Sequence, residues 1–280
     1  MTAALACRPA PMRRPGAFGR TLLRAFVALV CMFLTAPILM IVAMSFNAGD
    51  FLAFPPQGLS LRWYFALFQS ESFMRAAQTS LIVATAAMTI SMLLGTAAAV
   101  FLVRHAGPWR ERLRLFLMLP LLLPEILTAI ALLFFVYGTG TGIGTGTLAA
   151  MLIGHVLITF PFAFMNVASA LYNFDSSPEE AARSLGASPS VTFWRVTVPL
   201  IKPGLITGAL FAFIVSFDMF NMSLLLKGIG TTTLPTALFD YLRWDYDPTG
   251  AAVGSISVMV TLATILLIDR TWGLRSLRFG

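Results

Sequence analysis

The chain has 280 residues, of which 58% are hydrophobic and only 11% are charged. Soluble domains carry roughly a quarter of their residues as charged side chains, so this composition excludes a soluble globular protein and indicates an integral membrane protein. The formal net charge is +7. The basic residues are spread over separate loops without the interleaved aromatic residues that stack on single strands, so no nucleic-acid partner is expected.

Six apolar runs are long enough to cross a bilayer as helices, at about 20 residues each. Each run is continuously apolar rather than alternating, which predicts helices and not the strands of a barrel. In chain order, the predicted spans are residues 22–46, 76–103, 115–137, 148–171, 203–226 and 251–268. The predicted fold is therefore an all-α integral membrane bundle of about six transmembrane helices. Gly95 and Ala99 in the second run suit close helix packing.

Positive charge differs between the two sides of this arrangement. Of the 19 lysines and arginines, those on one side are Arg62, Arg75, Lys227 and Arg243, and the others lie on the side that holds both termini. The positive-inside rule predicts that both termini are cytoplasmic. The domain organisation is then a basic N-terminal tail at 1–21, a membrane domain at 22–268 and a C-terminal tail at 269–280. The basic N-terminal tail is expected to face anionic lipid.

A polar segment at about 172–202 separates the fourth and fifth predicted spans. Ser177, Pro178 and Glu180 form a Ser-x-x-Glu capping box with proline at the first helical position, which predicts that a helix starts there. Gly186 is predicted to end this helix after about two turns. Ser188 followed by Pro189 repeats the starting signal for a second short helix. The pattern predicts a cytoplasmic helix-turn-helix.

This segment resembles the EAA loop of the permeases of bacterial ABC importers. Glu180-Ala181-Ala182 is followed after three residues by Gly186, and after nine more by Val196-x-Val198-Pro199, with valines where the family usually has isoleucine and leucine. A resemblance to the spermidine/putrescine-type branch covers most of the chain, through Ser45-Phe46-Asn47, Gly58 to Tyr64, Thr79 to Ala84, Leu122 to Ile126, Ser216-Phe217-Asp218 and Thr233-Leu234-Pro235. Met219 departs from that branch, which commonly has a second acidic residue there.

The resemblance implies a permease subunit of the bacterial inner membrane that forms a solute pathway and couples it to ATP hydrolysis. The implied partners are two cytoplasmic ABC ATPase subunits, a second permease, an external solute-binding protein and membrane lipid. The implied solute is a polyamine or a similar small organic compound. The residues implied to contact the ATPase are Glu180, Ala181, Ala182, Arg183, Leu185 and Gly186.

The chain carries no recognisable site for ATP of its own. Its only lysines, Lys202 and Lys227, precede Pro203 and Gly228, so there is no Gly-Lys-Ser/Thr phosphate loop. We therefore expect no enzymatic activity and no bound cofactor in this chain, with ATP used by partner subunits. His105 and His155 have no cysteine or carboxylate at ligand spacing, so neither catalytic nor metal-ligating residues are expected.

Two acidic residues, Glu125 and Asp218, lie inside predicted spans. An ionisable group at mid-membrane costs about 2.5–3.5 kcal/mol or more, and it usually faces a cavity or a partner. Asp218 is expected to form a polar cluster with Ser216 and Asn221 on the solute pathway. Glu125 follows Pro124 and either lines the pathway or braces the break at the proline. A structural hydrogen bond to another helix is the alternative for either acid.

Two other functions are compatible with parts of this pattern. An ion-driven secondary transporter would use Glu125 and Asp218, but it would leave the polar segment at 172–202 without a role. A non-transporting membrane scaffold would need neither the acids nor that segment.

Overall fold

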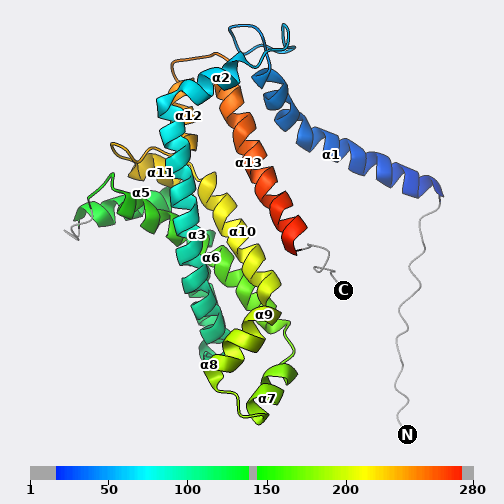
Figure 1. Cartoon of the computed structure of the whole chain (residues 1–280), viewed down its shortest axis with the longest axis vertical. Coiled ribbons are helices and arrows are strands. Elements are labelled where there is room, and N and C mark those ends of the chain that lie inside the picture. Colours follow the sequence, from blue (N-terminus) through cyan, green and yellow to red (C-terminus); the bar gives the residue numbers. More distant parts are fainter. Residues whose placement is uncertain (1–16, 139–143, 273–280) are drawn as a thin grey trace.

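The computed structural model describes residues 17–138 and 144–272 (Figure 1). Within these residues the chain is almost entirely helical and forms no strand. This confirms the predicted all-α class. Most of the predicted N-terminal and C-terminal tails lie outside the described residues.

Four helices of the described chain are long and apolar enough to cross a membrane. They are α1 (Ala17–Ser45), α3 (Glu71–His105), α6 (Leu148–Tyr172) and α13 (Thr249–Trp272). These four correspond to the first, second, fourth and sixth predicted spans. The total rises to six if two strongly bent helix pairs are each counted as one span.

The third predicted span is not one straight helix. It is divided into α4 (Arg110–Leu122) and α5 (Glu125–Gly138), which follow the short turn η1 (Gly107–Trp109) and meet at an angle of 95°. Pro124 lacks a backbone N–H and disfavours helical geometry in the residue before it, so α4 ends at the preceding residues. The apolar run predicted at 115–137 thus forms two helices, and the break lies at the proline that the sequence indicated.

The fifth predicted span is also interrupted. The helix α10 (Lys202–Phe217) ends at Asp218, and the separate short helix α11 (Asn221–Leu226) follows. Aspartate and asparagine compete with the helical backbone for hydrogen bonds, which favours their position at helix ends. At its other end, α10 meets the preceding helical segment, Pro189–Leu200, at a bend of 70°.

The centre of the bundle is formed by α3, α6 and α10, which pack side by side along most of their lengths (Figure 1). Small residues set this close approach. A Cβ atom added at Gly95 would lie 2.8 Å from the backbone nitrogen of Phe164 and 2.9 Å from the Cβ of Ala163. Ala99, one turn further along α3, is fully buried in the same contact. The expected helix packing at Gly95 and Ala99 is therefore confirmed.

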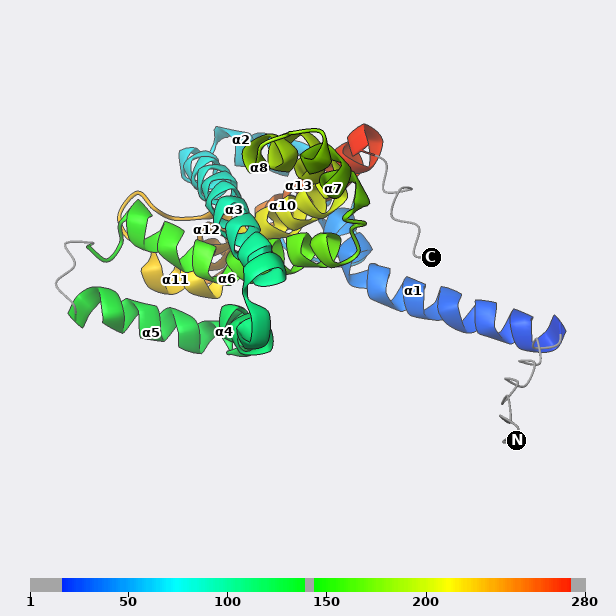
Figure 2. The ribbon, with the colours of Figure 1, turned by 90° about the horizontal axis from the view of Figure 1, so that it is seen from below.

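The first helix lies apart from this core. Figures 1 and 2 show α1 projecting away from the bundle, and its packing within the chain is chiefly against α13. The apolar part of α1 has no buried residues. Its surface is left to lipid or to another chain.

The two ends of the bundle carry different short helices (Figure 1). One end holds α2 (Arg62–Gln69) and α12 (Leu234–Leu242). The opposite end holds α7 (Ser177–Ser184), α8 (Pro189–Thr192), the π-helix η2 (Phe193–Thr197) and α9 (Val198–Leu200). The polar segment is thus placed at the end of the bundle where α3 ends and η1 follows it.

We predict that Gly95→Leu destabilises the bundle, because any side chain there forces α3 and α6 apart. Overpacking of a well-packed core costs about 1–3 kcal/mol. The measurement is the midpoint of thermal unfolding of the purified chain in detergent. Ala97→Leu is the control, because Ala97 is exposed on the same helix. Equal midpoints for the two variants would contradict the packing account.

Candidate functional site

The start of α7 differs from the predicted capping box. The helix begins at Ser177, with Ser176 as its N-cap residue and no hydrogen bond from a capping side chain. The Asp175 carboxylate accepts hydrogen bonds from the backbone N–H and the hydroxyl of Ser177, at 3.1 and 2.6 Å. These bonds hold the pKa of Asp175 below its ordinary value. Ser177 is engaged by the aspartate two residues before it, so it does not act as the predicted cap.

Glu180 interacts with a different serine from the one predicted. The hydroxyl of Ser176 donates to Glu180 Oε1 at 2.9 Å. The acid therefore bonds one residue earlier than the predicted capping box requires. Its carboxylate stays at the exposed surface of α7.

The end of α7 agrees with the sequence prediction. Gly186 adopts a left-handed conformation with φ of +86°. Its N–H donates to the Arg183 carbonyl at 2.9 Å, and the N–H of Ala187 donates to the Ala182 carbonyl at 3.0 Å. This pair of bonds is the Schellman motif, which strongly favours glycine at the left-handed position. The second predicted start is also confirmed, since Ser188 caps α8 by accepting from the N–H of Val191 at 3.4 Å.

The six predicted ATPase-contacting residues lie together on α7 and the turn that follows it. All are exposed except Ala182, which is half-buried. Leu185 is 89% exposed, and nothing lies within 4 Å of a Cβ added at Gly186. The turn after α7 is therefore open to a partner.

The other face of α7 carries a residue that sequence reasoning missed. Glu179 is only 7% exposed, and its Oε1 atom accepts hydrogen bonds from the Arg104 guanidinium and the Thr197 hydroxyl. Removing one partner of a buried ion pair typically costs about 3–5 kcal/mol, because the other charge is left uncompensated. The sequence near Glu179 held no signal for this contact, because Arg104 and Thr197 lie 75 and 18 positions away.

Two of the predicted pathway residues are brought together. Glu125, at the start of α5, accepts from the backbone N–H of Met222 at 3.2 Å and from Asn221 Nδ2 at 3.4 Å. Its carboxylate therefore holds the first residues of α11 next to the break at Pro124. This arrangement fits the bracing role that the sequence left open for Glu125.

The predicted cluster of Ser216, Asp218 and Asn221 does not form. Ser216 is buried, and its hydroxyl lies 2.8 Å from His155 Nδ1. Successive residues of α10 point in different directions, so Ser216 faces α6 while Asp218, at the end of α10, is exposed. Within the described residues, the Asp218 carboxylate has no ion-pair or hydrogen-bond partner.

His155 is a second residue whose role the sequence did not reveal. Its Nε2 atom lies 3.0 Å from the hydroxyl of Ser223, which itself donates to the Met219 carbonyl. The imidazole thus links α6 to both sides of the break between α10 and α11.

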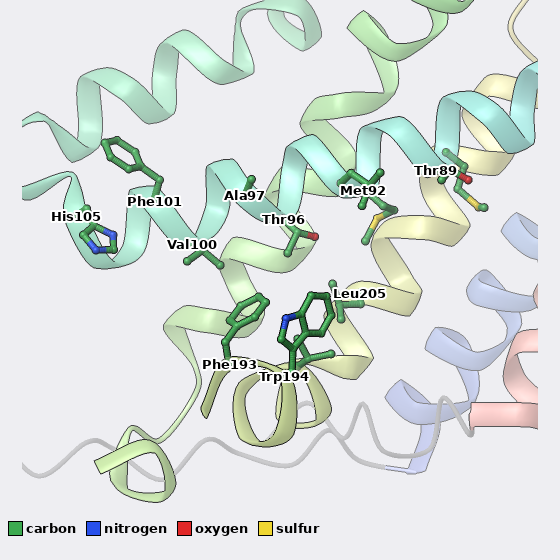
Figure 3. Close-up of a pocket in the computed structure, with 13 residues that line it drawn as sticks. Thr89, Met92, Thr96, Ala97, Val100, Phe101, His105, Phe193, Trp194 and Leu205 are labelled. Atoms are coloured by element: carbon green, nitrogen blue, oxygen red, sulfur yellow. The ribbon is translucent and has the colours of Figure 1, made fainter. Parts of the chain in front are cut away.

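An apolar cavity of about 820 Å³ lies between α3 and the segment that leads from η2 into α10 (Figure 3). Figure 3 shows Phe193 and Trp194 pointing toward α3, with Thr96 and Val100 facing them. The apolar lining makes this cavity unsuited to a charged solute. It also means that η2 and α3 do not pack closely along this length.

The comparison with protein families decides the identity of the chain. The family described as "Binding-protein-dependent transport system inner membrane component" matches residues 91–270. The chain belongs to this family. It is a permease subunit of an ABC importer and not an enzyme, because ATP hydrolysis in these systems belongs to separate ATPase subunits. Permeases of this family are multi-pass inner-membrane proteins that work with ATPase subunits and a binding protein.

Individual relatives agree with this assignment. This chain is 36% identical over 222 residues to the putrescine transport system permease protein PotI of Escherichia coli K12. The aligned region covers 77% of this chain and 78% of PotI. This chain is also 29% identical over 245 residues to the spermidine/putrescine transport system permease protein PotC of Haemophilus influenzae. That alignment covers 87% of this chain and 93% of PotC.

A solved structure has the same fold. A permease chain in the crystal structure of a bacterial alginate ABC transporter, in complex with an alginate pentasaccharide-bound periplasmic protein, matches with a TM-score of 0.70 and 17% identity. The match covers 91% of this chain and 94% of the other. At this identity the likeness concerns the fold and not the solute.

Proposed function

We propose that this permease forms part of the pathway for a polyamine or a similar small organic cation, driven by ATPase subunits that dock on α7. The observation that carries the proposal is the exposed face of α7 and its glycine turn in a chain of this family. The full assembly would hold two ATPase subunits, a second permease and an external solute-binding protein. ATP would be bound by the partner subunits and not by this chain.

The coupling surface consists of the six residues named above, Glu180, Ala181, Ala182, Arg183, Leu185 and Gly186. The surface would enter a cleft on the ATPase, with apolar contacts from Ala181, Ala182 and Leu185 and with Glu180 and Arg183 on a charged rim. The Schellman turn at Gly186 keeps the backbone compact, so that Leu185 projects without a neighbouring side chain beyond it. An apolar projection with a charged rim suits a stable but reversible contact.

The choice of a cationic solute is supported by the names of the two relatives and by the acids at the helix breaks. Polyamines are cations, and Asp218 presents an exposed carboxylate where α10 ends. Glu125, at the break between α4 and α5, accepts a hydrogen bond from Asn221 at the start of α11. Met219 is buried and supplies no second charge. Much of the selectivity is therefore assigned to the external binding protein.

The orientation proposed here places α7 and both termini in the cytoplasm. Its support is the distribution of lysine and arginine over the loops. The tails at 1–21 and 269–280 would then flank a membrane domain at 22–268 on the cytoplasmic side. Membership of the permease family does not favour an ion-driven carrier or a scaffold.

We predict that Gly186→Asp removes the ATPase subunits from the purified complex and stops uptake. A side chain at a left-handed position adds strain of about 1 kcal/mol, and an aspartate there also separates the turn from its partner. The measurement is the amount of ATPase that co-purifies with the permease. Gly230→Asp is the matched control, because Gly230 has φ of +82° and equally open surroundings at another place in the chain. Normal ATPase retention in Gly186→Asp would refute the coupling surface.

We predict that Asp218→Asn lowers uptake without disturbing assembly, because it removes the negative charge at the break and keeps the shape of the side chain. Uptake of radiolabelled putrescine into proteoliposomes is the measurement. Asp218→Glu, which keeps the charge, is expected to retain more uptake than Asp218→Asn. Full activity in Asp218→Asn would place this residue outside the pathway.

A further inference from the structure

The buried face of α7 is connected to the membrane bundle through one carboxylate. The Arg104 guanidinium and the Thr197 hydroxyl both donate to Glu179 Oε1, and Arg104 also lies 3.4 Å from the Thr197 hydroxyl oxygen. Arg104 is in the last turn of α3, and Thr197 is the final residue of η2. Glu179 is separated from these residues by 75 and 18 positions in the sequence. The carboxylate therefore joins three elements that are distant in the chain.

No other side chain of α7 makes such a link in the described part of the chain. The remaining side-chain hydrogen bonds of α7 stay within residues 175–184, as in the contacts of Ser176 with Glu180 and of Ser184 with the Glu180 carbonyl. The backbone of α7 packs against α8 and η2, which belong to the same polar segment. The direct polar connection from α7 to a membrane-spanning helix thus runs through Glu179.

Two cavities lie next to the Glu179 connection, and they reduce the other contacts between the polar segment and the membrane bundle. The apolar cavity of about 820 Å³ separates Phe193 and Trp194 from close packing with α3 (Figure 3). A second cavity, of about 520 Å³, lies beside α7 and is lined by residues that include Arg104, Phe174 and Arg183. Apolar packing holds the polar segment against α3 at Ile201, which is buried with Leu102 and Ala106, but it does not do so at Phe193 and Trp194.

The two adjacent glutamates of α7 face in different directions. Glu180 is exposed on the surface proposed to meet the ATPase, whereas Glu179 is buried against the bundle. A buried carboxylate requires compensating donors, and both of its donors lie on elements that continue into membrane helices. The carboxylate thus connects α7 to α3 through Arg104, and to the segment that leads into α10 through Thr197.

We infer that Glu179 and Arg104 are positioning residues that transmit the movement of α7 to the membrane helices. The inference rests on the proposed function, because it assumes that ATPase subunits dock on α7. It assigns the two glutamates separate tasks, since Glu180 belongs to the docking surface and Glu179 to the internal connection. Without the Glu179 connection, the ATPase stays bound and active, but ATP hydrolysis is uncoupled from solute transport.

The experiment uses the complete transporter, with its ATPase subunits and binding protein, in proteoliposomes. Glu179→Gln and Arg104→Met each break the ion pair, and Glu179→Arg combined with Arg104→Glu restores it with the charges exchanged. The measured quantities are the ATPase retained in the complex, the rate of ATP hydrolysis, and the solute taken up per ATP hydrolysed. Glu111→Gln is the control, because Glu111 forms an exposed ion pair with Arg114 on α4.

We expect both single variants to retain their ATPase subunits and to take up at least about fivefold less solute per ATP, the lower end of typical coupling between sites. The exchanged pair is expected to recover most of that loss, and Glu111→Gln to match the unchanged protein. An unchanged uptake per ATP in the single variants would overturn the inference, and so would failure of the exchanged pair to improve on them. Loss of the ATPase would instead assign Glu179 to the docking surface.

Two further results keep the experiment decisive. If Glu179→Gln does not accumulate in the membrane, Arg104→Lys and Thr197→Val test the same connection with smaller changes. Uptake per ATP is then expected to be highest in the unchanged protein, lower in Arg104→Lys and lowest in Arg104→Met. If the unchanged chain assembles with no ATPase, the proposed function itself fails. That outcome is distinct from an assembled transporter in which the variants remain fully coupled.

Discussion

A carboxylate that is buried at the end of a membrane bundle must be compensated, and the position of the whole polar segment depends on how Glu179 meets this requirement. Its donors come from α3 and from the residue that ends η2, so a single acid fixes α7 relative to one membrane helix and to the segment that leads into α10. With Glu179 directed inward, its neighbour Glu180 faces outward together with Leu185. The inner contact and the outer surface are thus consequences of one helical register.

The rest of the molecule consists of a closely packed core of α3, α6 and α10 and of two helix breaks, between α4 and α5 and between α10 and α11. Close approach at Gly95 lets α3 and α6 pack backbone against side chain, which resists deformation. The breaks at Pro124 and Asp218 carry the intramembrane acids, and each is held by polar contacts: Glu125 with the start of α11, and His155 with Ser216 and Ser223. Glu125 and His155 are thereby paired near irregular backbone, where free carbonyl and N–H groups also need partners, whereas Asp218 has no partner within the described residues.

Much of this arrangement was predictable from the sequence, because its signals are local. Apolar runs predicted the four long helices, and the glycine and serine signals predicted the end of α7 and the start of α8. The failures concern contacts between distant residues or competition between neighbours. Asp175 took the hydrogen bonds of Ser177, His155 took the hydroxyl of Ser216, and nothing near Glu179 in the sequence revealed Arg104 as its partner. The bend of 95° at Pro124 depends on how α4 and α5 pack, which hydropathy does not contain.

The coupling of α7 to α3 through Glu179 is tested by the distance between these two helices during the transport cycle. Spin labels on cysteines replacing Ser184 and Leu94, in a chain lacking Cys7 and Cys31, report this distance by pulsed electron paramagnetic resonance in the assembled transporter. The account predicts one narrow distance distribution that is the same with and without ATP, because Glu179 makes α7 move together with α3, and a broad distribution in Glu179→Gln. A distance that changes with ATP in the unchanged, actively transporting protein would contradict it.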